Sequence, residues 1–244
     1  MALTTFIMQL ALSILAFPMY LLNFLGLWKW ICQKWFPYFL EWLAVTYNKQ
    51  MASKKQELFS SLREFEGPSG KLTLLEVGCG TGPNFKFYPP GCRVTCIDPN
   101  PNFKKFLIKS VAENRHVQFE RFVVAAGENM HMVADGSVDV VVSTLVMCSV
   151  KNQEQFLREV YRVLRPGGAL HFLEHVVAEP STWTYFWQQV LKPTWYILFD
   201  GCDLMRESWK PLERAGFSKL KLQHLQAPLS IRPVVPHIYG YAVK

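Results

Sequence analysis

Short apolar runs rich in β-branched residues alternate with stretches of helical periodicity through the middle of the chain. Such runs are typical of parallel strands buried on both faces, and the helices between them supply the crossover connections. The runs fall at residues 72–77, 93–97, 117–124, 138–143 and 169–177, and the clearest helical stretches are 101–114 and 152–164. We therefore expect an α/β fold with a doubly wound, mostly parallel sheet.

The end of the chain breaks this alternation. Residues 217–225 and 237–243 both have the pattern of strands, and no helical stretch separates them. Two successive strands without a crossover helix between them pair antiparallel. The pattern therefore predicts a seven-stranded sheet that ends in an antiparallel C-terminal hairpin.

The first 28 residues carry no Asp, Glu, Lys or Arg. An apolar run of this length exceeds the ~20 residues needed to cross a bilayer, and it lacks the charged start and a clear cleavage site of a secretory signal, which is the alternative. We expect a retained membrane anchor, in which Pro18 either kinks a span or turns a hairpin within one leaflet. The flank just downstream is basic, which favours a cytosolic location for all that follows (Lys29, Lys34 and Lys49 against Glu41).

A chain of 244 residues, of which 50% are hydrophobic and 18% charged, has the size of one medium domain with a small appendage and excludes an intrinsically disordered protein. We expect a membrane anchor at 1–28, an amphipathic aromatic connector at 29–66 and a domain at 67–244 with an aromatic insertion at about 178–210. The domain opens at the chain-breaking residues Gly67, Pro68, Ser69 and Gly70.

The net charge of +7 raises nucleic acid as a partner, but the Lys and Arg residues are dispersed and form no nucleic-acid-binding motif. We expect no nucleic-acid partner, since attraction to an anionic leaflet explains the excess charge equally well. The six cysteines include no pair of CxxC motifs, and several lie in predicted strands or in a glycine-rich loop. We expect free thiols in a reducing compartment and no metal site.

The strongest local motif is a glycine-rich turn that directly follows the first predicted strand. Gly78, Gly80 and Gly82 allow the backbone to turn tightly and to approach a ligand closely at the carboxyl end of a strand. The spacing differs from the GxGxxG of dinucleotide-binding folds, and Pro83 stands where a phosphate-binding helix would begin. Glu76 precedes the loop and favours a cationic or amino-bearing ligand.

The next predicted strand ends in Asp98. A carboxylate at this position can accept hydrogen bonds from both hydroxyls of a ribose. Taken alone, it could also cap the helix that begins near Pro99. The neighbouring glycine loop favours the ribose role.

Together these residues resemble the cofactor site of the class I S-adenosylmethionine-dependent methyltransferases. The resemblance runs from about residue 71 to residue 177 and includes Asp-Gly-Ser-Val-Asp at 135–139 and Leu-Arg-Pro-Gly-Gly at 164–168. It implies an S-adenosyl-L-methionine site. In that site Glu76, Gly78, Gly80 and Gly82 surround the methionine part of the cofactor. Asp98 holds the ribose, and Gly127 with Glu128 borders the adenine. Related sequences usually carry Asp where this chain has Ala126. The adenine is then held by Glu128 instead, or by backbone and apolar contacts alone.

Over its whole length the chain resembles a small family of membrane-anchored thiol S-methyltransferases that are associated with the endoplasmic reticulum and lipid droplets. The resemblance implies methylation of small lipophilic thiols at a membrane or lipid-droplet surface, with the catalytic domain in the cytosol. Two other functions stay open: C- or O-methylation of a quinol or lipid, and a lipid-droplet scaffold with a disused cofactor pocket. Nothing in the sequence sets the oligomeric state.

The residues themselves give some support for a thiol acceptor. An alcohol needs a strong base or a metal, yet residues 144–148 after the fourth strand are nearly apolar. A thiol is partly ionised at pH 7 and is intrinsically nucleophilic. His175, beside Glu174 at the end of the fifth strand, is the candidate catalytic base, and a structural histidine is the alternative. We expect Cys148 to form a wall of the pocket rather than to act as a nucleophile.

All eight tryptophans lie outside residues 67–180 and form two groups of four. One group lies beside the apolar N-terminus and the other follows the fifth strand: Trp28, Trp30, Trp35 and Trp42, then Trp183, Trp187, Trp195 and Trp209. Tryptophan favours the boundary between water and lipid. We hypothesise that residues 182–199 pack with the connector at the membrane and roof the substrate pocket, with an ordinary aromatic core as the alternative.

Overall fold

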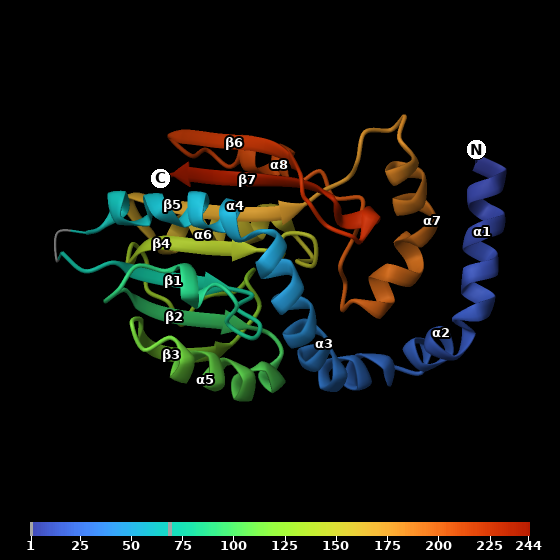
Figure 1. Ribbon diagram of the computed structural model, residues 1–244, viewed down its shortest axis with the longest axis horizontal. Helices are drawn as coiled ribbons and strands as arrows, with labels where there is room; N and C mark the ends of the chain where they lie inside the picture. The colour runs from blue at the N-terminus through green and yellow to red at the C-terminus, as the bar shows by residue number, and fades with distance from the viewer. Residues whose placement is uncertain (1, 68–69) are drawn as a thin grey trace.

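The computed structural model describes residues 2–67 and 70–244, which form a seven-stranded mixed sheet with helices on both faces (Figure 1). The strands are β1 (Thr73–Val77), β2 (Arg93–Asp98), β3 (Gln118–Val124), β4 (Val138–Thr144), β5 (Leu164–His175), β6 (Lys219–Gln226) and β7 (Pro236–Val243). They lie in the order β3-β2-β1-β4-β5-β7-β6. The first five are parallel to one another, and β7 runs antiparallel between β5 and β6.

This architecture confirms the predicted doubly wound sheet and its C-terminal hairpin. The predicted strands agree with the observed ones to within two residues, except that β5 begins at Leu164 rather than at residue 169. The earlier start has a backbone cause. Leu164 pairs with Val138 ahead of a register shift, and a Cβ on Gly168 would lie 2.7 Å from the backbone oxygen of Asp139, so only glycine allows the strands to approach this closely.

Two apolar cores lie on opposite faces of the sheet, because successive residues of a strand point to opposite sides. Leu74 of β1 packs in the core that contains Phe59, and Leu75 packs in the core that contains Phe156. The first core is covered by α4 (Ala52–Ser60), η1 (Ser61–Phe65) and α5 (Lys104–Glu113), and the second by α6 (Gln153–Val163) and α8 (Trp209–Arg214). The second half of the 29–66 connector is thus part of the α/β core. Of the predicted chain break, Pro68 and Ser69 lie outside the described residues.

The chain ahead of α4 forms α1 (Ala2–Leu15), α2 (Phe17–Phe24) and α3 (Trp28–Gln50). No single helix among the described residues has both the length and the apolar composition needed to cross a bilayer, but α1 and α2 meet that condition jointly and are bent by 76° relative to each other. The break falls at Ala16, and Pro18 occupies the first turn of α2. Proline is accepted there because the first backbone N–H groups of a helix have no acceptor within it.

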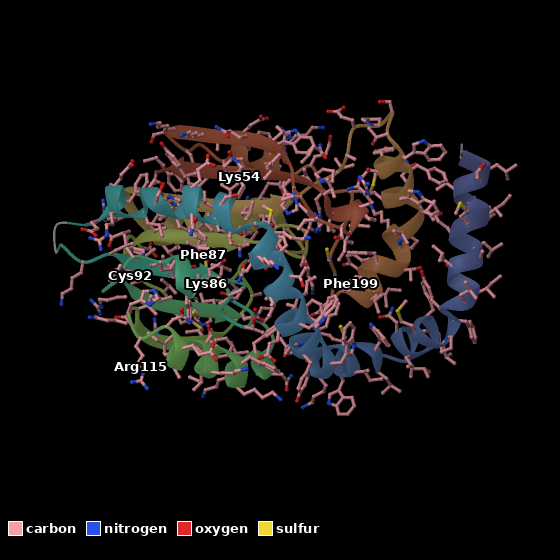
Figure 2. All side chains as sticks on the ribbon, in the orientation of Figure 1. Lys54, Lys86, Phe87, Cys92, Arg115 and Phe199 are labelled. Carbon is pink, nitrogen blue, oxygen red and sulfur yellow. The ribbon has the colours of Figure 1, made fainter. Side chains whose placement is uncertain are left out.

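Helix α7 (Trp183–Leu198) comes from the aromatic insertion and lies side by side with α1 (Figure 1). Hydrogen bonds join it to the N-terminal helices, among them Gln9 Nε2 to Gln189 O at 2.8 Å, Tyr20 Oη with Thr194 Oγ1 at 3.1 Å, and Trp28 Nε1 to Ile197 O at 2.7 Å. Just after α7, the ring of Phe199 packs 5.4 Å from that of Phe39 on α3 (Figure 2). The two tryptophan-rich segments, far apart in sequence, are therefore neighbours in space.

Candidate active site

The glycine loop after β1 has the conformation that its sequence predicts. Gly78, Gly80 and Gly82 all have positive φ, which side chains other than glycine rarely adopt. A Cβ on Gly78 would lie 2.4 Å from Val146 Cγ2, and one on Gly82 would lie 3.0 Å from Ser110 Oγ. At Gly80 the nearest atom would be 3.9 Å away. The loop is packed against protein at its two ends and has room for a ligand at its middle.

Glu76, at the carboxyl end of β1, is buried beneath this loop and has one carboxylate oxygen to spare. Its Oε1 accepts a hydrogen bond from Asn84 Nδ2 at 2.8 Å, whereas Oε2 has no partner among the described residues. Burial raises the pKa of Glu76 to about 7, although the Asn84 amide, the Tyr88 hydroxyl and the charge of Lys55 counteract part of that rise. A cationic group that enters the loop would find an unpaired acceptor here, which fits the ammonium of the expected cofactor.

A buried lysine, which the sequence did not indicate, completes this network. Lys55 of α4 donates from Nζ to Asn84 Oδ1 and to Asn48 Oδ1, both at 2.7 Å. Burial lowers the pKa of Lys55 to about 7, against the opposing influence of Glu76. The chain of contacts from Lys55 through Asn84 to Glu76 fixes the acid from the side of α4. No local motif could reveal it, because 29 residues separate Lys55 from Asn84.

Asp98 lies at the carboxyl end of β2, next to the glycine loop. Its two oxygens accept hydrogen bonds from Gly80 N at 3.1 Å and from Asn100 N at 2.9 Å. Burial raises the pKa of Asp98 to about 7, and these two backbone donors counteract part of the rise. An ionised carboxylate has about four lone-pair sites, so two remain for the hydroxyls of a ribose. The structure therefore brings together Asp98 and the loop, as the motif predicts.

The predicted adenine turn also lies beside the end of β1. A Cβ on Gly127 would lie 3.0 Å from Val77 Cγ1 and 2.9 Å from Phe156 Cδ2, so this position has no room for a side chain. The Glu128 carboxylate accepts a hydrogen bond from Lys151 N at 2.6 Å. Its role toward adenine stays a prediction, since that oxygen is already used to hold the start of the segment before α6.

Helix α3 crosses the carboxyl edge of the sheet and covers the cofactor loops (Figure 1). Asn48 Nδ2 donates to Pro83 O at 2.8 Å, and Asn100 Nδ2 donates to Gln33 O at 3.0 Å. Further along, the ring of Phe36 packs 6.3 Å from that of Phe103. The N-terminal segment is thus attached to both loops that carry the predicted cofactor residues.

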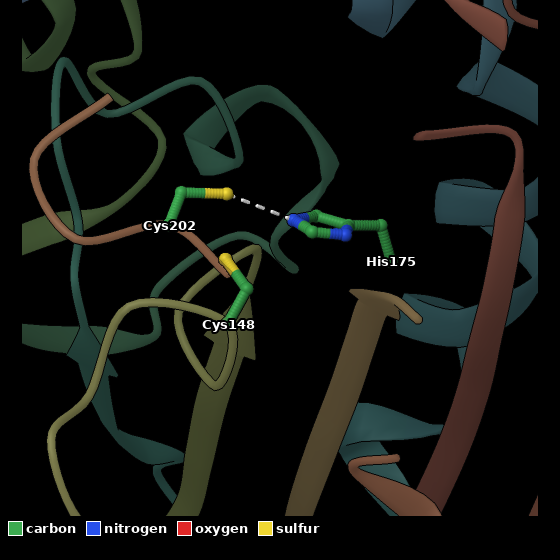
Figure 3. Close-up of side chains that lie close together, drawn as sticks. All are labelled: Cys148, His175 and Cys202. Atoms are coloured by element: carbon green, nitrogen blue, oxygen red, sulfur yellow. Dashed lines mark hydrogen bonds between the residues drawn. The ribbon is translucent and has the colours of Figure 1, made fainter. Parts of the chain in front are cut away.

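The predicted base His175 lies at the end of β5 in a cluster with two cysteines (Figure 3). Its Nε2 is 3.1 Å from Cys202 Sγ, and the ligand atoms of His175, Cys202 and Cys148 lie within 4.8 Å of one another. Burial acts to lower the pKa of His175, but Cys148, Glu174 and Asp203 together raise it above its usual value. Cys148 Sγ also contacts Leu145 O at 3.6 Å and Ser149 Oγ at 3.5 Å, and its role as a wall of the pocket stays a prediction.

Glu174 precedes His175 on β5 and holds the turn after β4. It accepts hydrogen bonds from Ser143 Oγ at 2.7 Å and from the backbone N–H groups of Val146 and Met147 at 2.9 and 3.1 Å. Leu145, at the start of this turn, has a φ of 58°, a conformation that costs a leucine about 1 kcal/mol or more. The turn therefore carries Val146 against the glycine loop and Cys148 against His175.

Comparisons with known proteins agree with this site. The family model described as "Methyltransferase domain" matches residues 75–172, the stretch that contains every predicted cofactor residue. Thiol S-methyltransferase TMT1A of Homo sapiens is 80% identical over 244 residues, 100% of both chains. Thiol S-methyltransferase TMT1B of Homo sapiens is 56% identical over 238 residues, 98% of both chains.

Solved structures agree with the fold at low sequence identity. The [4+2]-cyclase SpnF has a TM-score of 0.60 and 18% identity, with 80% of this chain and 81% of that chain covered. The geranyl diphosphate C-methyltransferase of Streptomyces coelicolor A3(2), in complex with S-adenosyl-L-homocysteine, has a TM-score of 0.59 and 14% identity, with 82% of each chain covered. Since one of the two is a cyclase, this likeness shows the fold and not the reaction.

Proposed function

The chain belongs to the thiol S-methyltransferase family, and from that premise we propose that it transfers the methyl group of S-adenosyl-L-methionine to small lipophilic thiols at a membrane surface. The observation that carries this proposal is the 80% identity with TMT1A over the full length of both chains. The residues around the glycine loop support it. Glu76 and Asp98 offer free acceptor sites for the ammonium and for the ribose hydroxyls of the cofactor.

The chemistry needs little beyond positioning. The cofactor, when bound, supplies a methyl group on a sulfonium, which a thiolate can attack directly. Asp98 and the glycine loop orient that group, and α3 covers the loops and limits the access of water. Holding two reactants in line lowers the barrier to such a transfer substantially. A thiol is already partly ionised at pH 7, so no strong base is required.

We also propose that the N-terminal helices and α7 attach the enzyme to the membrane, at the cytosolic face of the endoplasmic reticulum and on lipid droplets. Large apolar side chains on these helices are exposed: Leu3, Phe6, Ile7, Leu10, Ile14, Leu15, Phe17, Leu21, Phe24, Trp30, Trp42, Val45, Trp183, Trp187 and Tyr196. The α/β domain exposes far fewer. A concentrated apolar surface of this kind is typical of membrane contact. The resemblance to the membrane-anchored family supports the choice of organelle.

A methyl-transfer assay with methyl-labelled cofactor tests the function. The full-length protein in detergent is offered hexanethiol, a substituted phenol and an alkyl amine of similar size. We expect label in the thioether product, with little transfer to the phenol or amine. The control is Asp98→Ala, which should lose most transfer at a low cofactor concentration.

Two results would contradict the proposal, one from this assay and one from a titration with the cofactor. Turnover of the phenol in place of the thiol would favour methylation of a quinol or lipid. Absence of cofactor binding by calorimetry at physiological concentrations would favour a scaffold with a disused pocket.

A further inference from the structure

Three side chains from distant parts of the chain converge just beyond the carboxyl edge of the sheet. Cys148 follows β4, His175 ends β5, and Cys202 follows α7 (Figure 3). Their ligand atoms lie within 4.8 Å of one another. In a tetrahedral zinc site the ligand atoms are about 3.5 to 3.8 Å apart, as metal–ligand distances of about 2.0 and 2.3 Å require. A movement of about 1 Å would therefore bring all three to coordination distance.

We propose that Cys148, His175 and Cys202 bind a zinc ion, and that the sulfur of the thiol substrate occupies its fourth coordination position. Two cysteines, one histidine and one open position form a ligand set that catalytic zinc sites use. The three protein ligands are inferred from their geometry alone. The fourth ligand, the substrate sulfur, rests on the proposed thiol methylation.

The surroundings suit a buried metal ion. Two thiolates and a neutral imidazole balance the charge of a dication, so the site with zinc and without substrate would be neutral, as burial favours. Trp195 Nε1 donates to Cys202 Sγ at 3.3 Å, which is the kind of outer contact that orients a metal ligand. Cys148 and His175 are buried, whereas Cys202 is partly exposed.

The cluster also lies beside the cofactor loop. Cys148 shares the turn after β4 with Val146, which packs directly against Gly78. Asp203, next to Cys202, donates from its backbone N–H to Cys148 O at 3.0 Å and so joins the two cysteine segments. Leu145 and Asp200, which precede Cys148 and Cys202 by three and two residues, both have positive φ, at 58° and 48°.

A metal at this place would supply the activation that methylation of a thiol benefits from. The substrate S–H loses its proton to solvent as the sulfur binds, since a coordinating thiol is deprotonated. A lone pair of that sulfur then forms the new S–CH3 bond, and the C–S bond of the cofactor sulfonium breaks with its electron pair left on the cofactor sulfur. The products are a neutral thioether, which binds zinc weakly, and S-adenosylhomocysteine. His175 is thereby a metal ligand in place of the base that the sequence predicts.

The test uses full-length protein in detergent, without a histidine tag and with a phosphine as the reductant, so that no added thiol or imidazole competes. After zinc loading and dialysis, we expect about one zinc per chain by elemental analysis. Cys148→Ser, Cys202→Ser and His175→Gln should each weaken zinc binding by about 10-fold or more. Cys92→Ser is the matched control, because Cys92 is a buried cysteine ahead of β2 at the opposite edge of the sheet (Figure 2).

A second measurement needs no variant and no turnover. Cobalt in place of zinc should give a thiolate-to-cobalt charge-transfer band that changes when hexanethiol is added and stays unchanged with hexanol. A wild-type chain that retains no metal overturns the proposal, and so does a cobalt band that ignores the thiol. Methyl transfer by metal-free protein would overturn the zinc site while the proposed function stands. A thiol-sensitive cobalt band in a protein that methylates no thiol would overturn the proposed function, while the metal site would stand.

Discussion

Asp98 carries the clearest expectation for a single residue. Asp98→Ala removes a charge-assisted acceptor for the ribose, so cofactor affinity should fall by about 2 kcal/mol, or roughly 30-fold, in a calorimetric titration. Asp135→Ala is the control, because Asp135 is an exposed acid that pairs with Arg162 away from the loop. Equal affinities for the wild-type protein and the Asp98 variant would refute the ribose role.

Alanine substitutions at Gly78 and Gly91 separate the cost of backbone strain from the cost of overpacking. Both have positive φ, but a Cβ meets Val146 at Gly78 and finds open space at Gly91. Gly91→Ala should cost about 1 kcal/mol of folding free energy from the backbone alone. Gly78→Ala should cost about 3 kcal/mol, since overpacking adds to the strain, and should also weaken cofactor binding. Equal losses in denaturant unfolding would contradict the packing role of Val146.

His171 gives the fold a dependence on pH. It is buried in β5 with Nε2 3.1 Å from Ser61 Oγ and the rings of Phe65 and Tyr241 packed against it. Burial lowers its pKa to about 3, below the 6.5 of the unfolded chain. The unfolded state therefore binds the extra proton first, and stability is complete above pH 6.5 and is lost as the pH falls toward 3.

Replacing this histidine should remove that loss. Between pH 7 and pH 5 the free energy of unfolding of His171→Gln should gain about 2 kcal/mol relative to the wild-type protein. His131→Gln is the control, because His131 is exposed. Parallel pH profiles of stability for the wild-type and His171→Gln proteins would disprove that His171 causes this loss.

The candidate cofactor residues could be brought together from the sequence because they belong to a local motif: Glu76 to Gly82 are nearly contiguous, and Asp98 ends the next strand, and their roles toward the cofactor stay predictions. The cluster around His175 could not, since 27 residues separate His175 from Cys202 and only the return of the chain through α7 brings them together. The burial of Lys55 could not be predicted either. An exposed surface lysine and a buried one have the same appearance in a single sequence.

At the scale of elements, α4 acts as a support for the glycine loop rather than as a linker. Lys55→Met keeps the length of the side chain but leaves Asn84 Oδ1 and Asn48 Oδ1 without their donor. We expect a loss of about 2 kcal/mol in stability and weaker cofactor binding, because Asn84 also orients Glu76. Lys54→Met is the matched control at the next position, since Lys54 is partly exposed and forms a surface ion pair with Glu57 (Figure 2). A similar effect of both substitutions would remove this role from Lys55.

Strands and helices of the α/β domain could be predicted closely because their periodicity matches their burial. The N-terminal region could be predicted only in part. Its lack of charge indicates an apolar segment, but the 76° bend at Ala16 and the continuation of α3 through Pro37 depend on packing against α7 and the cofactor loops. Apolar composition alone does not set the direction of successive helices.

At the scale of the molecule, the exposed apolar side chains and the site face the same end. The parallel strands point their carboxyl ends toward α3 and α7, and the C-terminus lies at the opposite end (Figure 1). A lipophilic substrate that partitions into a membrane at this end would have a short path to the cofactor loops. Seven of the eight tryptophans lie on α3 or α7 at this end, whereas Trp209 lies on α8 in the α/β domain.

This orientation predicts which tryptophans contact lipid. Trp183 is 79% exposed on α7 and Trp30 is 66% exposed on α3, whereas Trp209 packs 5.3 Å from the ring of His224 in the α/β domain. In full-length protein bound to vesicles of brominated phosphatidylcholine, Trp183→Phe and Trp30→Phe should each remove part of the quenchable fluorescence, because bromine quenches only at lipid depth. Trp209→Phe should lower the total emission and leave the quenched part unchanged. If Trp183→Phe and Trp209→Phe behave alike, α7 does not touch the membrane, and the substrate must reach the site from water.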